Sequence, residues 1–103
     1  MSQLSSPSQL SSPPEPRLLD RVRAEIRLRG LSRQTEKAYV NWIKRYILFF
    51  GKRHPQSLGS GEIREFISHL AVELDVALPT QKQALAALLF LYREVLGIQL
   101  PVI

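Results

Sequence analysis

The chain has 103 residues, which is enough for one small domain and too few for most two-domain enzymes. Hydrophobic residues make up 45% of it, which excludes a wholly disordered chain. Its longest apolar run, residues 84–92, is far shorter than the roughly twenty residues of a membrane-spanning helix. No cysteine is present, so disulfides and a thiolate nucleophile are excluded. Met1 is followed by Ser, Gln and Pro instead of an apolar signal segment, and we therefore expect a cytoplasmic protein.

The net charge of +5 is unevenly distributed along the chain. Residues 17–53 contain eleven Lys and Arg against three Asp and Glu, a net of +8; residues 54–103 contain three against five, a net of −2, and Glu15 adds −1. Positive charge concentrated in this way is typical of a protein that binds a polyanion such as nucleic acid. A solvated basic face that only favours solubility is the alternative.

Composition separates a tail from a domain. Residues 1–16 include six Ser, four Pro and two Gln, so most of them cannot contribute to a core, and we expect a disordered Ser/Pro-rich tail. Residues 17–101 contain four stretches with helical periodicity and predict one helical domain.

The first two helices are predicted at residues 17–29 and 33–50. Gly30 follows the first as a C-terminal stop. For the second, Ser32 is expected to be the N-cap and Gly51 the stop. Its aromatic and aliphatic residues recur every three or four positions: Tyr39, Trp42, Ile43, Tyr46, Ile47 and Phe50.

A loop at residues 52–61 separates these helices from a third helix, predicted at 62–74. Thr80 and Gln83 then match a capping box, which predicts a fourth helix at residues 81–96. The fourth helix is apolar nearly all round, so we expect it to lie centrally or to bury a second face against a partner. Four helices with short connections predict an all-α four-helix bundle.

No group of residues has the spacing that catalysis or metal binding requires. His54 lies in a loop without an acidic neighbour, and His69 is one turn from two glutamates, a spacing more typical of a surface contact than of a metal site. Tyr39, Tyr46 and Tyr92 fall on apolar stripes, which indicates core packing with the hydroxyls at the rim. We therefore expect no metal, no cofactor and no small-molecule substrate.

Two predicted helix starts carry positive charge where the helix dipole disfavours it. Arg33 and Lys37 lie in the first turns of the second helix, and Lys82 lies at the start of the fourth. Such cations suit a site where backbone N–H groups hold a phosphate. Chance placement on the surface is the alternative.

The fourth helix also begins with uncharged side chains that are suited to contact base edges: Thr80, Gln81 and Gln83. Glutamine is suited to adenine in particular.

The sequence also resembles a known family. Separate blocks carry the resemblance, in this order: LSRQTEKAY at 31–39, Trp42-Ile43, Phe49-Phe50, GKRHP at 51–55 and TQKQALAALLFLYREVLG at 80–97. Together they resemble the N-terminal core-binding domain of tyrosine recombinases, and the last block is similar to integron integrases in particular. The resemblance extends over about residues 17–101.

This resemblance implies a SAM-like domain that forms one jaw of a clamp around double-stranded DNA, with its second and fourth helices towards the major groove. It also implies that neighbouring recombinase subunits touch when assembled on the recombination site. The matching candidates for DNA contact are Arg33, Thr35, Lys37, Asn41, Lys44 and Arg45 on the second helix, and Thr80, Gln81, Lys82 and Gln83 on the fourth.

Members of that family also have a catalytic domain, with two arginines, a lysine, a histidine and a nucleophilic tyrosine. We expect that domain to be absent from this chain, which would then bind and position DNA during integration and recombination without cutting it. The rival hypothesis is a helical protein-interaction module that acts through the apolar fourth helix.

Overall fold

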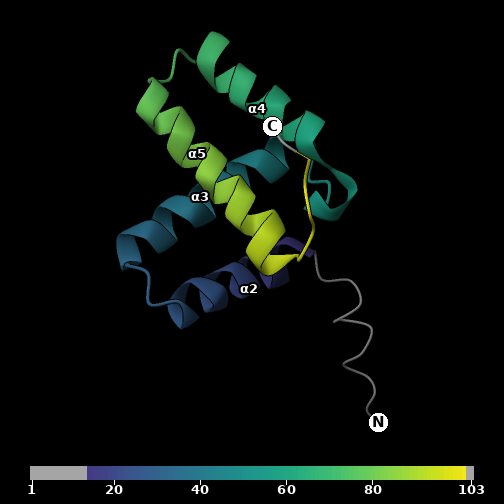
Figure 1. Cartoon of the computed structure of the whole chain (residues 1–103). Coiled ribbons are helices and arrows are strands. Elements are labelled where there is room, and N and C mark those ends of the chain that lie inside the picture. The colour runs from purple at the N-terminus through teal and green to yellow at the C-terminus, as the bar shows by residue number, and fades with distance from the viewer. Residues whose placement is uncertain (1–13, 102–103) are drawn as a thin grey trace.

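The computed structural model describes residues 14–101, with side chains from Arg17 onward. All regular structure in that range is helical, which confirms the all-α prediction with four main helices (Figure 1). The elements are α2 (Pro14–Leu28), α3 (Arg33–Phe49), the 3-10 helix η1 (Pro55–Ser57), α4 (Ser60–Val72), α5 (Leu78–Phe90) and η2 (Leu91–Val95), a π-helical turn that continues α5. No helix within these residues combines the length and apolar character needed to cross a membrane.

The N-terminal boundary of the domain differs from the prediction. The first described helix, α2, begins at Pro14 rather than at residue 17, so residues 14–16 belong to the helix and not to a tail. The rest of the predicted disordered tail, residues 1–13, lies outside the described residues. Proline is tolerated in a first helical turn because its missing N–H has no intrahelical partner there. The Ser, Pro and Gln content of residues 1–16 therefore placed the boundary too late.

A continuous rod formed by α5 and η2 is the centre of the domain. Its α5 part packs against both α3 and α4, and its η2 part reaches α2 (Figure 1). The side chains of Ala84, Ala87, Leu88 and Leu91 in this rod are completely buried. The predicted central position of the fourth helix is therefore confirmed. The other helices contribute the remaining core, including Leu18, Val22, Ile26, Ile43, Ile47, Ile63, Phe66 and Leu70.

Both predicted signals at the ends of α3 are confirmed. The Ser32 hydroxyl accepts a hydrogen bond from a first-turn N–H at 3.1 Å, and Gly51 follows the helix with a φ of +68°, a conformation that glycine adopts without steric cost. The next helix, α4, begins slightly before the predicted residue 62. There the Gly59 N–H donates to the carboxylate of Glu62 at 2.8 Å, which satisfies one free donor at the helix start.

The predicted capping box at the start of the fourth helix is wrong. Helix α5 begins at Leu78, with Ala77 as its N-cap and no side-chain cap. Pro79 lies in the first turn, where its fixed φ favours helix and its missing N–H leaves one fewer donor to satisfy. Thr80 is consequently already inside the helix, and its N–H donates to the Ala77 carbonyl at 3.0 Å.

The hydroxyls of Tyr46 and Tyr92 lie inside the core, not at its rim as predicted. Both side chains are 0% exposed; the Tyr92 hydroxyl donates to the Pro55 carbonyl at 2.6 Å, and the two hydroxyl oxygens are 3.0 Å apart. A carbonyl can only accept, so the Tyr92 proton points to Pro55 and Tyr46 must donate to Tyr92. Burial is the main cause that raises the pKa of both tyrosines, which keeps these hydroxyls protonated.

Removing one hydroxyl at a time tests the direction of this hydrogen-bond chain. Tyr92→Phe leaves the Pro55 carbonyl and the Tyr46 hydroxyl without partners, and we expect it to lower the free energy of unfolding by about 2 kcal/mol or more. Tyr46→Phe removes only a donor and should cost less than about 1 kcal/mol. Urea denaturation followed by circular dichroism measures both variants. A larger cost for Tyr46→Phe would contradict the assigned direction.

An ion pair joins the end of α2 to the start of α3. Nε and Nη2 of Arg27 donate to the two carboxylate oxygens of Glu36, each at 3.0 Å. Glu36 is buried despite its charge, and the hydrogen bonds from Arg27 are the main cause that lowers the pKa of this carboxyl. Two parallel bonds fix the geometry as well as the charge, so the pair sets how α3 lies against α2.

This pair predicts a pH dependence of stability. Because the pKa of Glu36 is lower in the folded state, its contribution is complete above the unfolded value of about 4.3 and is lost as the pH falls through the folded value. We expect Glu36→Gln to lower the urea midpoint at neutral pH, and the difference from the parent chain to shrink as the pH falls below about 4.3. A difference that stays constant into acid would show that the charge of Glu36 is irrelevant to it.

Candidate nucleic-acid interface

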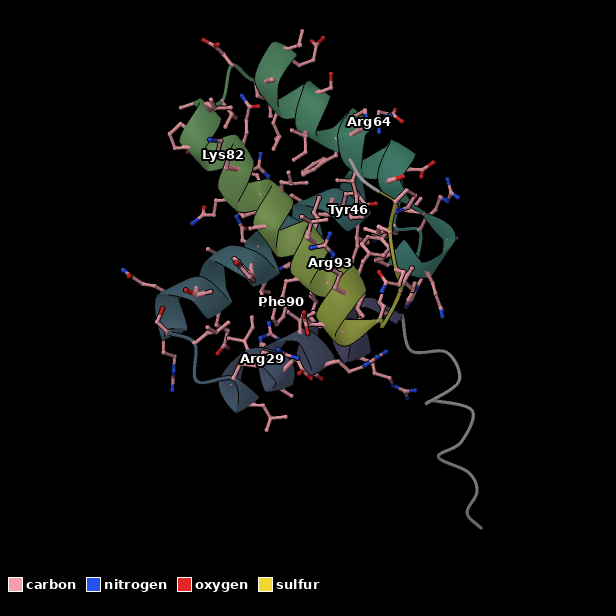
Figure 2. The ribbon with its side chains drawn as sticks, viewed as in Figure 1. Arg29, Tyr46, Arg64, Lys82, Phe90 and Arg93 are labelled. Carbon is pink, nitrogen blue, oxygen red and sulfur yellow. The ribbon has the colours of Figure 1, made fainter. Side chains whose placement is uncertain are left out.

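Several basic residues of the 17–53 stretch bond within the molecule. Nη2 of Arg21 donates to the Val95 carbonyl at 2.7 Å, and Arg29 pairs with Glu94 at 2.7 Å. Arg29 also lies 5.9 Å from the centre of the Phe90 ring, and Figure 2 shows these two side chains between α2 and the rod. Both arginines therefore hold α2 against η2, so part of the concentrated positive charge stabilises the fold.

Four exposed cations on α3 make no hydrogen bond or ion pair within residues 14–101. One of them, Arg45, instead lies over the Trp42 ring, and the other three are Arg33, Lys37 and Lys44. Their spacing of four and seven residues places them along one edge of the helix, since an α-helix has 3.6 residues per turn. With a rise of 1.5 Å per residue, the row extends over about 16 Å. These cations remain available to an external anion.

Lys37, Asn41 and Lys44 lie together beside α2. With Arg23 of α2 they line a shallow hollow, and Arg23 and Lys44 also line an adjoining hollow that reaches Lys52. The structure therefore brings three of the predicted contact residues into one place. Arg23 and Lys52 were missed because the candidates came only from the two helices that the family resemblance indicated. The run of basic residues was the signal that could have identified them.

Arg45 lies on a different flank of α3. Its guanidinium carbon is 4.6 Å from the centre of the Trp42 ring, and the Trp42 indole N–H donates to the side-chain oxygen of Gln83 at 3.2 Å. Arg45 also lines a hollow between α3 and α4, together with Phe49 and His69. The predicted residues of α3 therefore face two sides, with Lys37, Asn41 and Lys44 towards α2 and Arg45 towards α4.

The predicted contact residues at the start of α5 differ in their exposure and in their internal hydrogen bonds. Thr80 and Lys82 are exposed, and Lys82 lies near the beginning of the rod in Figure 2. Gln81 is half-buried, and its amide nitrogen donates to the Val76 carbonyl at 2.8 Å, which closes the turn between α4 and α5. On α3, Thr35 is also half-buried and accepts a hydrogen bond from the N-cap hydroxyl at 3.0 Å. Gln81 and Thr35 thus have structural roles that the sequence pattern did not reveal.

Helices α3 and α5 cross, and both begin on the left of the view in Figure 1. Tyr39 of α3 meets Phe90 of α5 with ring centres 5.5 Å apart, and Trp42 meets Gln83 further along. Gln83 is therefore the predicted contact residue of α5 that is bonded directly to α3. It connects the candidate surface of one helix with that of the other.

Neither histidine belongs to a cluster of potential metal ligands within the described part of the chain. Nδ1 of His54 accepts a hydrogen bond from the Gln56 N–H at 3.0 Å and so caps η1. The His69 ring lies 4.7 Å from the Phe49 ring, centre to centre. Both side chains therefore have local packing and capping roles.

Comparison with known proteins places this geometry in context. The family model described as phage integrase, N-terminal SAM-like domain, matches residues 18–102. Curated proteins named "Integrase/recombinase" from Escherichia coli and Pseudomonas aeruginosa are each 49% identical to the chain over 85 residues. Each match covers 82% of this chain and 25% of the relative. The chain therefore spans about a quarter of the length of the curated relatives it matches.

Proposed function

The chain belongs to the phage integrase family as its N-terminal SAM-like domain, and from this membership we propose that it binds double-stranded DNA at a recombination site. The names of its relatives support a role in site-specific recombination. We further propose that it is of the integron integrase type, on the resemblance of residues 80–97, and that it meets other recombinase subunits on the DNA. It positions DNA, while cutting belongs to a catalytic domain of the kind that tyrosine recombinases possess.

The observation that carries the proposal is the row of unpaired cations on α3. Arg33, Lys37 and Lys44 are exposed and have no internal partner within the described residues, whereas the arginines of α2 that face η2 are bound. The unpaired cations thus form the α3 row, while Arg23 of α2, which lines the same hollow as Lys37 and Lys44, is paired with Asp20 at 3.1 Å. Lysines without partners, beside the exposed amide of Asn41, suit phosphate oxygens, which need charge and hydrogen-bond donors but no fixed base sequence.

In this proposal, phosphate contact and base contact are assigned to different elements. The α3 row and Arg23 take the phosphates, while the start of α5 and the flank of α3 that bears Arg45 face the base edges. Phosphate contacts set position and most of the affinity, and base contacts set the choice of sequence.

The rival protein-interaction hypothesis loses its main support in this fold. That hypothesis was based on the apolar character of the fourth helix. In this fold, the side chains of Ala84, Leu88 and Leu91 are buried inside the domain, each with 0% exposure. The larger apolar side chains that remain accessible on the rod are Leu78, 60% exposed at its first residue, and four half-buried ones: Leu85, Leu89, Phe90 and Val95. That leaves little apolar surface on the rod for a partner protein.

The binding should depend steeply on salt. If about four cations meet phosphates, the logarithm of the association constant should fall with the logarithm of salt concentration at a slope near −4, because counterions are released. Fluorescence anisotropy with a labelled duplex at increasing salt measures this slope. An affinity that does not change with salt, or no binding to any duplex at low salt, would overturn the proposed function.

Reversing charges in the α3 row should weaken DNA binding more than reversing the same number of charges elsewhere. We expect Lys37→Glu with Lys44→Glu to reduce binding to all duplex sequences by at least about 100-fold at low salt, since two attractive phosphate contacts become repulsive. The matched control is Arg64→Glu with Arg93→Glu, which changes the net charge equally at exposed sites on α4 and η2 (Figure 2). Equal losses in both double variants would contradict a specific α3 surface.

A further inference from the structure

The side-chain amide of Gln83 has a defined orientation. Its partner is the indole N–H of Trp42, 3.2 Å away, within the range of an N–H···O hydrogen bond. An indole N–H can only donate, so the amide oxygen of Gln83 must face it. The amide nitrogen is then turned away from the indole, and its two N–H groups have no partner within the described residues. Gln83 itself is exposed, so these donors are accessible.

The indole that orients Gln83 is itself held on several sides. Trp42 is only 6% exposed, and the Arg45 guanidinium lies over its ring at 4.6 Å. The Phe66 ring meets it edge-on, with ring centres 6.5 Å apart. An aromatic ring held by a cation on one side and a second ring on another has little freedom to turn. Trp42 is therefore a positioning residue for Gln83.

We propose that Gln83 is a specificity-determining residue that offers a base edge its two N–H donors and withholds its oxygen, so that it selects guanine over adenine. A free glutamine reads adenine by pairing one donor and one acceptor with N6 and N7 of that base. In Gln83 the acceptor is engaged by Trp42, so that pairing is disfavoured. Guanine presents two acceptors, O6 and N7, which match two donors. This proposal differs from the sequence-based expectation that glutamine at this position suits adenine.

Gln81 provides a contrast within the same helix. Its amide nitrogen is the engaged atom, bonded to the Val76 carbonyl at 2.8 Å, and its oxygen has no partner within the described residues. The two glutamines, which look equivalent in the sequence, therefore have opposite free groups. Of the two, only Gln83 is both exposed and able to donate two bonds at once.

The inference rests on the proposed function and is tested by the base preference of the chain. The probe is a library of duplexes with randomised sequence, bound at low salt and sequenced after selection. We expect the parent chain to prefer guanine over adenine at one position of the selected site by at least about fivefold. Trp42→Phe frees the amide to turn, so adenine should become acceptable there and the preference should fall below about twofold.

A second variant covers the possibility that Trp42→Phe does not fold, which circular dichroism would reveal. Gln83→Glu changes an exposed residue and replaces the donors by acceptors, so the preference at that position should move from guanine to cytosine, whose N4 group donates. Lys44→Ala in the α3 row is the control, expected to weaken binding to all sequences and leave the preference unchanged.

The outcomes separate this inference from the proposed function. Selection of adenine by the parent chain, or an unchanged preference in Gln83→Glu, would overturn the role of Gln83 while leaving DNA binding intact. The same preference in a folded Trp42→Phe variant would overturn the positioning role of Trp42. No binding to any duplex would overturn the proposed function itself, and the role of Gln83 with it.

Discussion

The crossing of α3 by the α5 and η2 rod is the contact on which the rest of the domain depends. Tyr46 of α3 and Tyr92 of η2 meet through their hydroxyls inside the core, and the same chain of hydrogen bonds reaches Pro55 at the start of η1. Further along α3, Trp42 bonds to Gln83 of α5. One set of interhelical contacts therefore fixes the core, anchors a loop and orients a side chain at the surface.

The cations that donate hydrogen bonds within the described residues are all arginines, although Arg33 of α3 stays free. Arginine makes the internal bonds, as in the two-atom pairing of Arg27 with Glu36 and the contact of Arg21 with the Val95 carbonyl, because its planar group presents several donors in a fixed geometry. Lys37 and Lys44, by contrast, stay free at the surface. A compact ammonium on a flexible stem suits phosphate oxygens, whose positions along a DNA backbone vary with sequence.

Local signals in the sequence were sufficient to predict the helices, their order and the ends of α3, because Ser32 and Gly51 act on their immediate neighbours. Predictions that depended on distant contacts were less successful. The pattern Thr80-x-x-Gln83 predicted a cap, but the helix begins at Leu78, and Trp42, far away in sequence, engages Gln83. Of the ten predicted contact residues, Lys37, Asn41 and Lys44 lie together, whereas the bonds of Thr35 and Gln81 appear only once the chain is folded.

Orientation by the fold also bears on how a small domain can select a DNA sequence. A free glutamine loses up to about 2 kcal/mol of side-chain conformational entropy when it is fixed against a base, which offsets much of the gain from its hydrogen bonds. Gln83 is already restrained by Trp42 in this structure, so less of that loss would fall on the proposed base contact. The same restraint makes the wrong base more costly, because an amide that cannot turn cannot adapt to it. Few base contacts can then discriminate, provided that the cations of α3 supply the affinity.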